Sequence, residues 1–517
     1  MKYIVILLAA VSTFVNLYAQ QGRQLVANTE FFNRRNVSRI FHKPSYYALN
    51  PVVRAEYDWE LNANGDPYAA PFSGGVWFDE KVSKFKMWYS AGGEKKYGLI
   101  TCYAESWDGK HWNKPCLDVV PGTNIVDTTE HDCVSVLLDK FEPDSAKRYK
   151  MFIVGFNNSS SVSMILKYSA NGIHWSEPKA LSGELYDRCA AYYDPFRKEY
   201  VLSLKTINGK IYRRSRCFLA HEDPELLVSL AHRVYDHKND KFIKYWFNAE
   251  EDDPRHPLFP GIRPQIYNHE AMPYENGMLG YFTVWQGPEN NVCDCLMIQK
   301  RNEVLIGWSR DGFLWDRESK EPFLPVSEDF HAWNAGNVQS TAGSPIIVGD
   351  SLYFYVSGRY NSKPAHDSNF ATGLAMLRRD GFVSLRAGTT EGVFETEELL
   401  TDGKYLFVNA DVRHPGSMLA IEILDKDGNA VEGFTRDENV IMTQTSSTRH
   451  LVFWKNRKNL SELIGKGIKL RFHLSKGDFY SFWLSPWKSG ESRGYTAGGG
   501  PELDASGKDI LTGNPLE

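Results

Sequence analysis

A short motif that recurs along the chain constrains the fold more than any other feature of the sequence. It joins an Asp-Gly or Asn-Gly turn to a tryptophan three residues later, at 106–112, 169–175 and 309–315, with a degenerate copy at 379–382. The turn residues Asp108, Asn171, Asp311 and Asp380 are separated by 63, 140 and 69 residues, so the middle interval is about two periods long. Glycine allows the positive φ that such turns need between strands. The period predicts stacked or radially arranged repeat units.

A second series of segments has the same period. Each segment has an alternating apolar strand, a polar turn and a second aromatic-rich strand, with turns near Asp79, Asp139, Asp194, Asn276 and Asp350. Alternation on both sides of a turn is typical of a β-hairpin. Five hairpins, each followed by further strands, predict five four-stranded blades. We therefore expect an all-β protein in which residues 20–390 form a five-bladed β-propeller.

The remainder of the chain has a different pattern. From Glu391 the repeated motif stops, and short alternating strands follow with turns at Asp427-Gly428 and Lys476-Gly477. This pattern predicts a C-terminal antiparallel β-sandwich over residues 391–487. Residues 488–517 are glycine-rich, and we expect a flexible tail there.

The first residues are typical of a secretory signal peptide. Lys2 precedes an apolar run from Tyr3 to Val15, and the small residue Ala19 follows. We expect cleavage of residues 1–19, a secreted or periplasmic mature protein, and no membrane insertion after cleavage, since no later apolar run is long enough to span a bilayer. The net charge of −5 argues against a nucleic-acid partner. The sequence gives no indication of the oligomeric state.

Three acids occupy matching places in successive hairpins. Asp132 and Asp187 each lie seven residues before their turn, and Glu270 lies at about the same distance before Asn276-Gly277. Equivalent positions on the innermost strands of a propeller converge on one funnel, so we expect the three carboxyls to meet. Cleavage of a glycosidic bond needs one protonated and one ionised carboxyl. The pattern predicts catalysis on an oligosaccharide or polysaccharide, with no metal or cofactor.

Further polar and aromatic residues are expected to bind the substrate. His131, Arg188 and His269 are next to the acids in sequence. Ser73 and Gln339 occupy the equivalent places in the first and last blades, and Arg263 and Trp333 lie in loops. Aromatic rings such as Trp333 stack against the apolar faces of sugars.

The chain resembles the five-bladed glycoside hydrolases of families 32 and 43, and most of all bacterial proteins labelled family 32-like. The resemblance runs from about Ile40 to Ser485 and is carried by NPVV (50–53), APFSGGVWFD (70–79), KRYKMF (147–152), YDRC with DPFR (186–197) and YNHEAMPYE (267–275). It implies that Asp132 is the nucleophile or general base, Asp187 the stabiliser and Glu270 the general acid. The fructosidase signature Trp-Met-Asn-Asp-Pro and the Arg-Asp-Pro motif are absent, so fructan activity is not expected.

Other interpretations stay open at this stage. The leading hypothesis is an exported, exo-acting glycoside hydrolase. A propeller-type glycoside phosphorylase would use Arg188 and the cluster Arg213, Arg214 and Arg216 to bind phosphate. A non-catalytic sugar-binding propeller would use the acids only as hydrogen-bond acceptors. The acids are alternatively structural partners of arginines, and Asp253, in a long loop, is a possible substitute for one of them.

Overall fold

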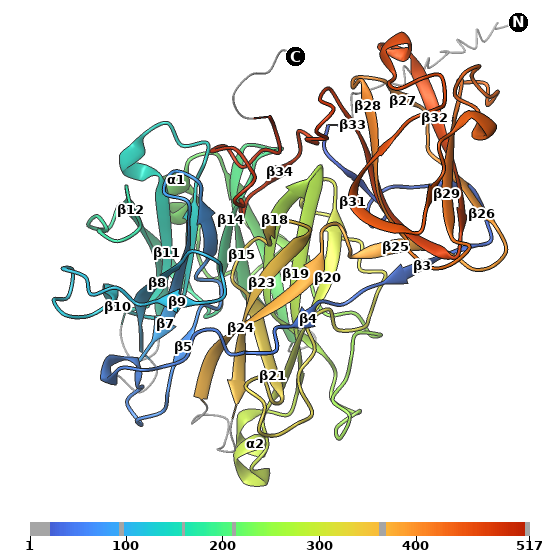
Figure 1. The fold of residues 1–517 in the computed structure, drawn as a ribbon. Coiled ribbons are helices and arrows are strands. Elements are labelled where there is room, and N and C mark those ends of the chain that lie inside the picture. The colour runs from blue at the N-terminus through green and yellow to red at the C-terminus, as the bar shows by residue number, and fades with distance from the viewer. Residues whose placement is uncertain (1–20, 93–97, 158–160, 209–212, 361–368, 512–517) are drawn as a thin grey trace, which may run out of the picture.

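A computed structural model describes residues 21–92, 98–157, 161–208, 213–360 and 369–511. Over these residues the chain is nearly all-β and forms several sheets (Figure 1). Its described α-helices are short: α1 (Pro224–Leu230) and α2 (Asn290–Leu296). No helix in the described ranges is long and apolar enough to cross a membrane.

The larger body has three sheets, because β8 pairs with β10 and β20 pairs in parallel with β21, and we group its strands into five units that follow one another along the chain. The first unit contains β5 (Ala69–Ala70), β6 (Val76–Asp79), β7 (Lys84–Ala91), β8 (Leu99–Ser106) and β9 (Trp112–Asn113), and the second contains β10 (Ile125–Leu138), β11 (Tyr149–Phe156), β12 (Val162–Ser169) and β13 (Ala180–Leu185). The third unit contains β14 (Ala190–Asp194), β15 (Glu199–Asn208), β16 (Arg213–His221) and β17 (Lys244–Phe247), and the fourth contains β18 (Gln265–Glu275), β19 (Gly277–Gly287) and β20 (Arg301–Ser309). The fifth unit contains β21 (Asn337–Thr341), β22 (Ile346–Val348), β23 (Ser351–Tyr360) and β24 (Asn369–Arg378), with β4 (Ser45–Tyr46) paired to β24. The five predicted hairpins are confirmed by the antiparallel pairs β6–β7, β10–β11, β14–β15, β18–β19 and β22–β23.

The recurring Asp-Gly turn is built in the same way in the units that carry it. In the first unit the Ser106 hydroxyl accepts the Gly109 N–H at 2.9 Å, and the Asp108 carboxylate accepts the N–H of Lys110 at 2.8 Å. The glycine has a φ of +72° there, and its counterpart Gly172 has +81°. Side-chain oxygens thus satisfy the amides of a turn whose backbone favours glycine.

Hydrogen bonds join neighbouring units and connect the fifth to the first. Trp88 of the first unit donates its indole N–H to Gly172 O of the second at 2.7 Å, and Tyr355 of the fifth donates its hydroxyl to Gly109 O of the first at 2.7 Å. The backbone adds Val76 N to Ala342 O, also between the first and fifth units, at 2.7 Å. The first and last units are therefore in direct contact.

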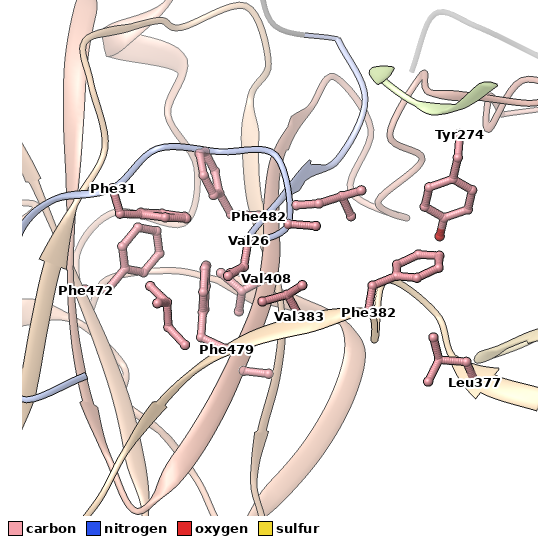
Figure 2. Packing of buried hydrophobic residues seen from close by; sticks show 14 of the residues in the cluster. Val26, Phe31, Tyr274, Leu377, Phe382, Val383, Val408, Phe472, Phe479 and Phe482 are labelled. Atoms are coloured by element: carbon pink, nitrogen blue, oxygen red, sulfur yellow. The ribbon is translucent and has the colours of Figure 1, made fainter. Parts of the chain in front are cut away.

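A second body contains two further sheets (Figure 1). One has β3 (Val37–Phe41), β25 (Val383–Ala387), β33 (Gly477–Ser485), β28 (Tyr405–Val412) and β31 (Thr445–Val452), with β1 (Gln24–Leu25) beside β33; the other has β2 (Phe32–Arg35), β26 (Gly392–Glu395), β32 (Gly467–Ser475), β29 (Met418–Leu424) and β30 (Met442–Thr443), with β27 (Leu399–Leu400) beside β32. Figure 2 shows their shared core, where Phe31 meets Phe472 and Phe479 edge to face at 6.4 and 6.1 Å. The N-terminal strands belong to these sheets, so this body extends beyond the predicted 391–487.

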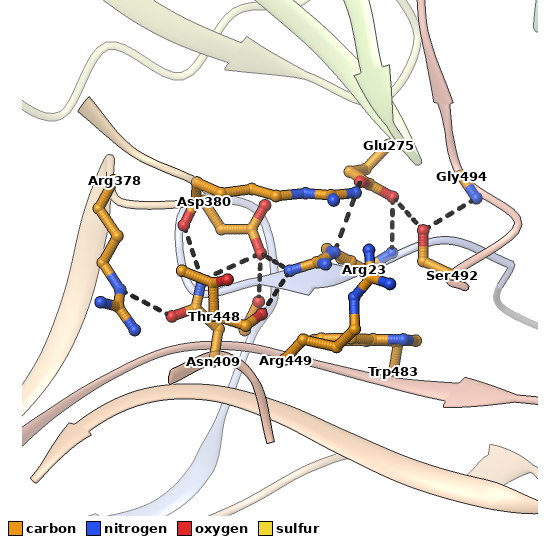
Figure 3. A network of polar contacts seen from close by, with 12 residues as sticks. Arg23, Glu275, Arg378, Asp380, Asn409, Thr448, Arg449, Trp483, Ser492 and Gly494 are labelled. Atoms are coloured by element: carbon orange, nitrogen blue, oxygen red, sulfur yellow. Dashed lines mark hydrogen bonds and ion pairs between the residues drawn. The ribbon is translucent and has the colours of Figure 1, made fainter. Parts of the chain in front are cut away.

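Residues 488–511, the described part of the expected flexible tail, make defined contacts with the rest of the chain. β34 (Tyr495–Thr496) pairs with the end of β18, and Asp509 is buried. Figure 3 shows the polar network beside it, in which Arg23 donates to Asp380 at 2.9 Å. Arg379 donates to Asp509 at 2.9 Å. Glu275 contacts both arginines, at 3.7 and 3.2 Å. Buried charges need such pairing, and it fixes the described part of this segment against both bodies.

Candidate active site

One hydrogen-bonded path joins two of the three predicted acids, Asp132 and Glu270, and the third, Asp187, directly precedes Arg188 of that path. Asp132 lies in β10, Asp187 just before β14, and Glu270 in β18. Arg188 N donates to Asp132 Oδ2 at 3.2 Å, and the Arg188 carbonyl accepts from Arg216 Nη2 at 2.8 Å. The same Nη2 donates to Asn268 Oδ1 at 2.9 Å, and Asn268 Nδ2 donates to Glu270 Oε1 at 3.4 Å. The second, third and fourth units thus meet at this site.

Arg188 connects Asp132 to Arg216 in this path. Its φ of +55° is uncommon for a residue with a side chain and costs on the order of 1 kcal/mol. The conformation aims its backbone N–H at Asp132, and its guanidinium Nε lies 3.3 Å from the same oxygen. The guanidinium carbon also lies 4.5 Å from the centre of the Phe72 ring. Charge pairing and stacking hold the residue in this backbone conformation.

Glu270 lies in an almost closed environment, with 3% of its surface exposed. Its Oε2 accepts from Thr341 N at 2.9 Å and from Thr341 Oγ1 at 3.1 Å. Burial raises the pKa of Glu270 to about 8, although hydrogen bonds from Ser73 and Thr341 and the charge of Arg216 favour ionisation. The carboxyl therefore carries its proton at neutral pH.

Asp187 has the opposite protonation state. Burial alone would raise its pKa, but the ammonium of Lys205, which bonds to it directly, and the charges of Arg188 and Arg214 lower the pKa below the ordinary value. Its side chain is 41% exposed and that of Asp132 is 20% exposed, so both reach solvent. One protonated and one ionised carboxyl in one site is the combination that general acid–base chemistry requires.

Both histidines predicted to bind substrate are fully buried. His131 Nδ1 donates to Thr129 O at 3.0 Å, and Nε2 lies 3.2 Å from Ser90 Oγ. The His269 ring packs edge to face against Trp246 and Phe247, at 4.8 and 5.0 Å. Burial lowers the pKa of both imidazoles. Neutral rings in these positions support the strands that carry Asp132 and Glu270.

The remaining predicted residues are spread more widely. Ser73 Oγ accepts from Asn268 Nδ2 at 3.1 Å, which brings the first unit into the site. Gln339 is buried in β21, and its Nε2 has no hydrogen-bond partner among the described residues. Arg263 is 62% exposed and lies 3.6 Å from Glu251, in the loop before β18.

Two loop residues have structural partners. Trp333 meets Tyr46 edge to face at 5.5 Å. It also covers Gly358 and Gly373, where an added Cβ would lie 2.2 and 2.0 Å from its ring. Asp253 is buried and accepts two hydrogen bonds from Arg317, at 2.5 and 2.7 Å. Neither residue belongs to the hydrogen-bonded path between the acids.

Several residues of the site were not among the predicted ones. Asn268 and Thr341 bind Glu270, and Lys205 binds Asp187. Arg216, noted in the sequence only as a possible phosphate ligand, donates to both Arg188 O and Asn268. Asn268 lies two residues before Glu270 on the same strand, so the period of a strand was a usable signal. Lys205 and Thr341 lie on other strands, and no local pattern marks them.

The described residues contain no group of three or more His, Cys, Asp or Glu side chains arranged to hold a metal ion.

Comparison with known proteins gives similarities at the level of solved structures. No protein-family model and no curated protein matches the chain. A structure of an N-acetylgalactosamine deacetylase from F. plautii with blood group B trisaccharide is 12% identical, with 67% of this chain and 97% of that chain covered and a TM-score of 0.43. A glycosyl hydrolase from Bacteroides ovatus is 13% identical, with 65% and 94% covered and a TM-score of 0.40. A β-1,2-mannobiose phosphorylase from Listeria innocua in complex with β-1,2-mannobiose is 13% identical, with 66% and 97% covered and a TM-score of 0.40.

Proposed function

We propose that this chain is a glycoside hydrolase in which Glu270 is the general acid. The observation that carries the proposal is a protonated Glu270, with a pKa of about 8, joined by hydrogen bonds to Asp132, together with an ionised Asp187 next to Arg188 of the same path. Two carboxyls whose environments drive their pKa values apart are the usual basis for dividing acid and base roles.

The reaction follows from these protonation states. Glu270 donates its proton to the glycosidic oxygen as the bond to the leaving sugar breaks. Asp132, fixed by Arg188, attacks the anomeric carbon or takes a proton from the attacking water. Asp187, held by Lys205, orients the sugar hydroxyls and stabilises the positive charge that develops on the ring. Thr341 and Asn268 position the Glu270 carboxyl.

The wider setting of the proposal comes from the architecture. We infer that the five units are the blades of a propeller and that the second body is the expected sandwich, because the fifth unit bonds to the first and the two aromatic-rich sheets share one core. A funnel lined by the inner strands favours an exo-acting enzyme on the end of an oligosaccharide. We also propose export, on the signal-like residues 1–19, which lie outside the described residues.

The test compares sugar release by the wild-type protein with release by Glu270→Gln and Asp132→Asn. Both variants are expected to keep the fold and to lose turnover of unactivated glycosides. Glu270→Gln should keep measurable turnover of an aryl glycoside whose leaving group needs no proton, because only the acid has been removed. Glu222→Gln removes an exposed carboxyl and serves as the control. Full turnover in both site variants would contradict the proposal, and binding without release would indicate a sugar-binding protein.

A further inference from the structure

A group of basic side chains surrounds the proposed catalytic aspartates. Lys300 belongs to this group and directly precedes β20. Burial lowers the pKa of its ammonium, and the positive charges of Arg359, Arg188 and Arg214 lower it further. Lys300 forms no ion pair among the residues that the structure describes. Four cations thus share one electrostatic field, and one of them has no counterion.

The two aspartates neutralise only part of this group. Asp132 is paired with Arg188, at 3.3 Å, and Asp187 is paired with Lys205. Glu270 carries its proton and adds no negative charge. Arg214 has an acidic neighbour, Glu289, at a longer distance of 3.6 Å. Positive charge therefore remains in excess around Lys300.

Tyr267 packs beside two of these cations, Lys300 and Arg214. The Lys300 Nζ lies 5.2 Å and the Arg214 guanidinium carbon 6.0 Å from the centre of its ring. Burial opposes ionisation of the phenol, yet Lys300 and Arg188 lower its pKa, while Asp187 and Asp132 act in the opposite direction. The phenol thus lies beside two of the cations and in the electrostatic field of both aspartates.

We propose that the substrate of this site carries a negative charge, a carboxylate or a sulfate ester on the sugar, and that Lys300 and Arg214 bind that charge beside Tyr267. This inference rests on the proposed glycoside hydrolase function and names its substrate class. An anion supplies the counterion that Lys300 lacks, and Arg214 presents a planar guanidinium suited to a two-oxygen group. A neutral sugar would leave this charge uncompensated in a partly buried site.

The experiment measures binding to Glu270→Gln, which keeps the ligand intact. The probes are galacturonate and galactose 6-sulfate, each compared with galactose and with the methyl ester of galacturonate. The readouts are calorimetry and tryptophan fluorescence, since Trp285 lies 4.9 Å from the Arg214 guanidinium carbon. At least one charged sugar is expected to bind about tenfold more tightly than its uncharged counterpart. Whether galacturonate or galactose 6-sulfate binds more tightly shows whether the site prefers a carboxylate or a sulfate.

Variants of the basic group give the second part of the test. Added to Glu270→Gln, Lys300→Met should remove the preference for the charged sugar, and Lys300→Arg should restore most of it. Lys241→Met, which removes an exposed lysine, should leave the preference unchanged. Equal binding of charged and uncharged sugars would overturn the inference, as would an unchanged preference in Lys300→Met. So would acceleration of neutral-sugar cleavage by inorganic phosphate, which assigns the cations to phosphate. If the charged sugar binds more tightly but the wild-type protein releases no sugar from any substrate, the result would contradict the hydrolase function and support the anion site.

Discussion

The protonated state of Glu270 can be tested through stability, without knowledge of the substrate. Its pKa is 4.5 in an unstructured reference and about 8 in the folded protein. Between these values the folded protein holds a proton that the unfolded chain releases, so the free energy of unfolding falls as pH rises. The slope is about 1.4 kcal/mol per pH unit, which gives about 3 kcal/mol between pH 5 and pH 7 and about 5 kcal/mol over the full window.

Glu270→Gln removes this dependence because the amide resembles the protonated acid and cannot ionise. Urea unfolding of both proteins at pH 5, 6, 7 and 8 gives the difference in unfolding free energy. The unfolding free energy of the variant, minus that of the wild type, is expected to rise by about 1.4 kcal/mol for each unit that the pH rises. Glu222→Gln corrects for the loss of one carboxyl at the surface. A difference that stays constant across this range would refute the argument that burial keeps Glu270 protonated.

Three further predictions follow from the same structure. The kcat/KM of the wild-type enzyme is expected to be flat from about pH 5 to 7 and to fall about tenfold per pH unit above about pH 8, as Glu270 ionises; a steady rise through pH 9 would contradict its role as an acid. Arg23→Met leaves two buried carboxylates without this partner and should lower the unfolding free energy by about 3–5 kcal/mol, measured in urea; a loss below about 1 kcal/mol would mean that the buried network is not structural. Gly172→Ala should destabilise by more than about 1 kcal/mol, because φ is +81° there and a Cβ would lie 2.3 Å from the Trp88 ring; Gly388→Ala, with open space around it, should change stability by less than about 0.5 kcal/mol, and equal losses in both would contradict this packing.

The repeated parts of the fold were predictable from the sequence. The hairpins and the recurring turns use local signals, namely two-residue alternation and a glycine after Asp or Asn, and the structure has them where the pattern predicts. Of the acids with matched spacing, Asp132 and Glu270 are joined by one hydrogen-bonded path and Asp187 lies beside it, while their catalytic roles stay predictions. These features depend on a few neighbouring residues, so they can be predicted from the sequence without knowledge of the fold.

Other features depend on contacts between distant residues. The N-terminal strands β1, β2 and β3 add to sheets formed after residue 383, and nothing in their short sequences indicates that pairing. Asp509 is buried because Arg379, 130 residues away, pairs with it. Local composition indicated a flexible tail, and the buried ion pair outweighs that composition.

The cation group around Lys300 is another long-range product of the fold. Arg188, Arg214, Lys300 and Arg359 come from three units and are far apart along the chain. Their convergence on Tyr267 requires the arrangement of the units, so spacing alone could not reveal it.

The most direct test of the central claim is a sugar-release screen of residues 20–517 with Glu270→Gln alongside. The panel contains neutral, uronate-bearing and sulfated oligosaccharides, each with and without inorganic phosphate, and products are separated by chromatography. The account predicts that the wild-type protein releases a sugar from at least one charged oligosaccharide without needing phosphate, and that Glu270→Gln releases none. Equal release by the wild-type protein and the variant would contradict it.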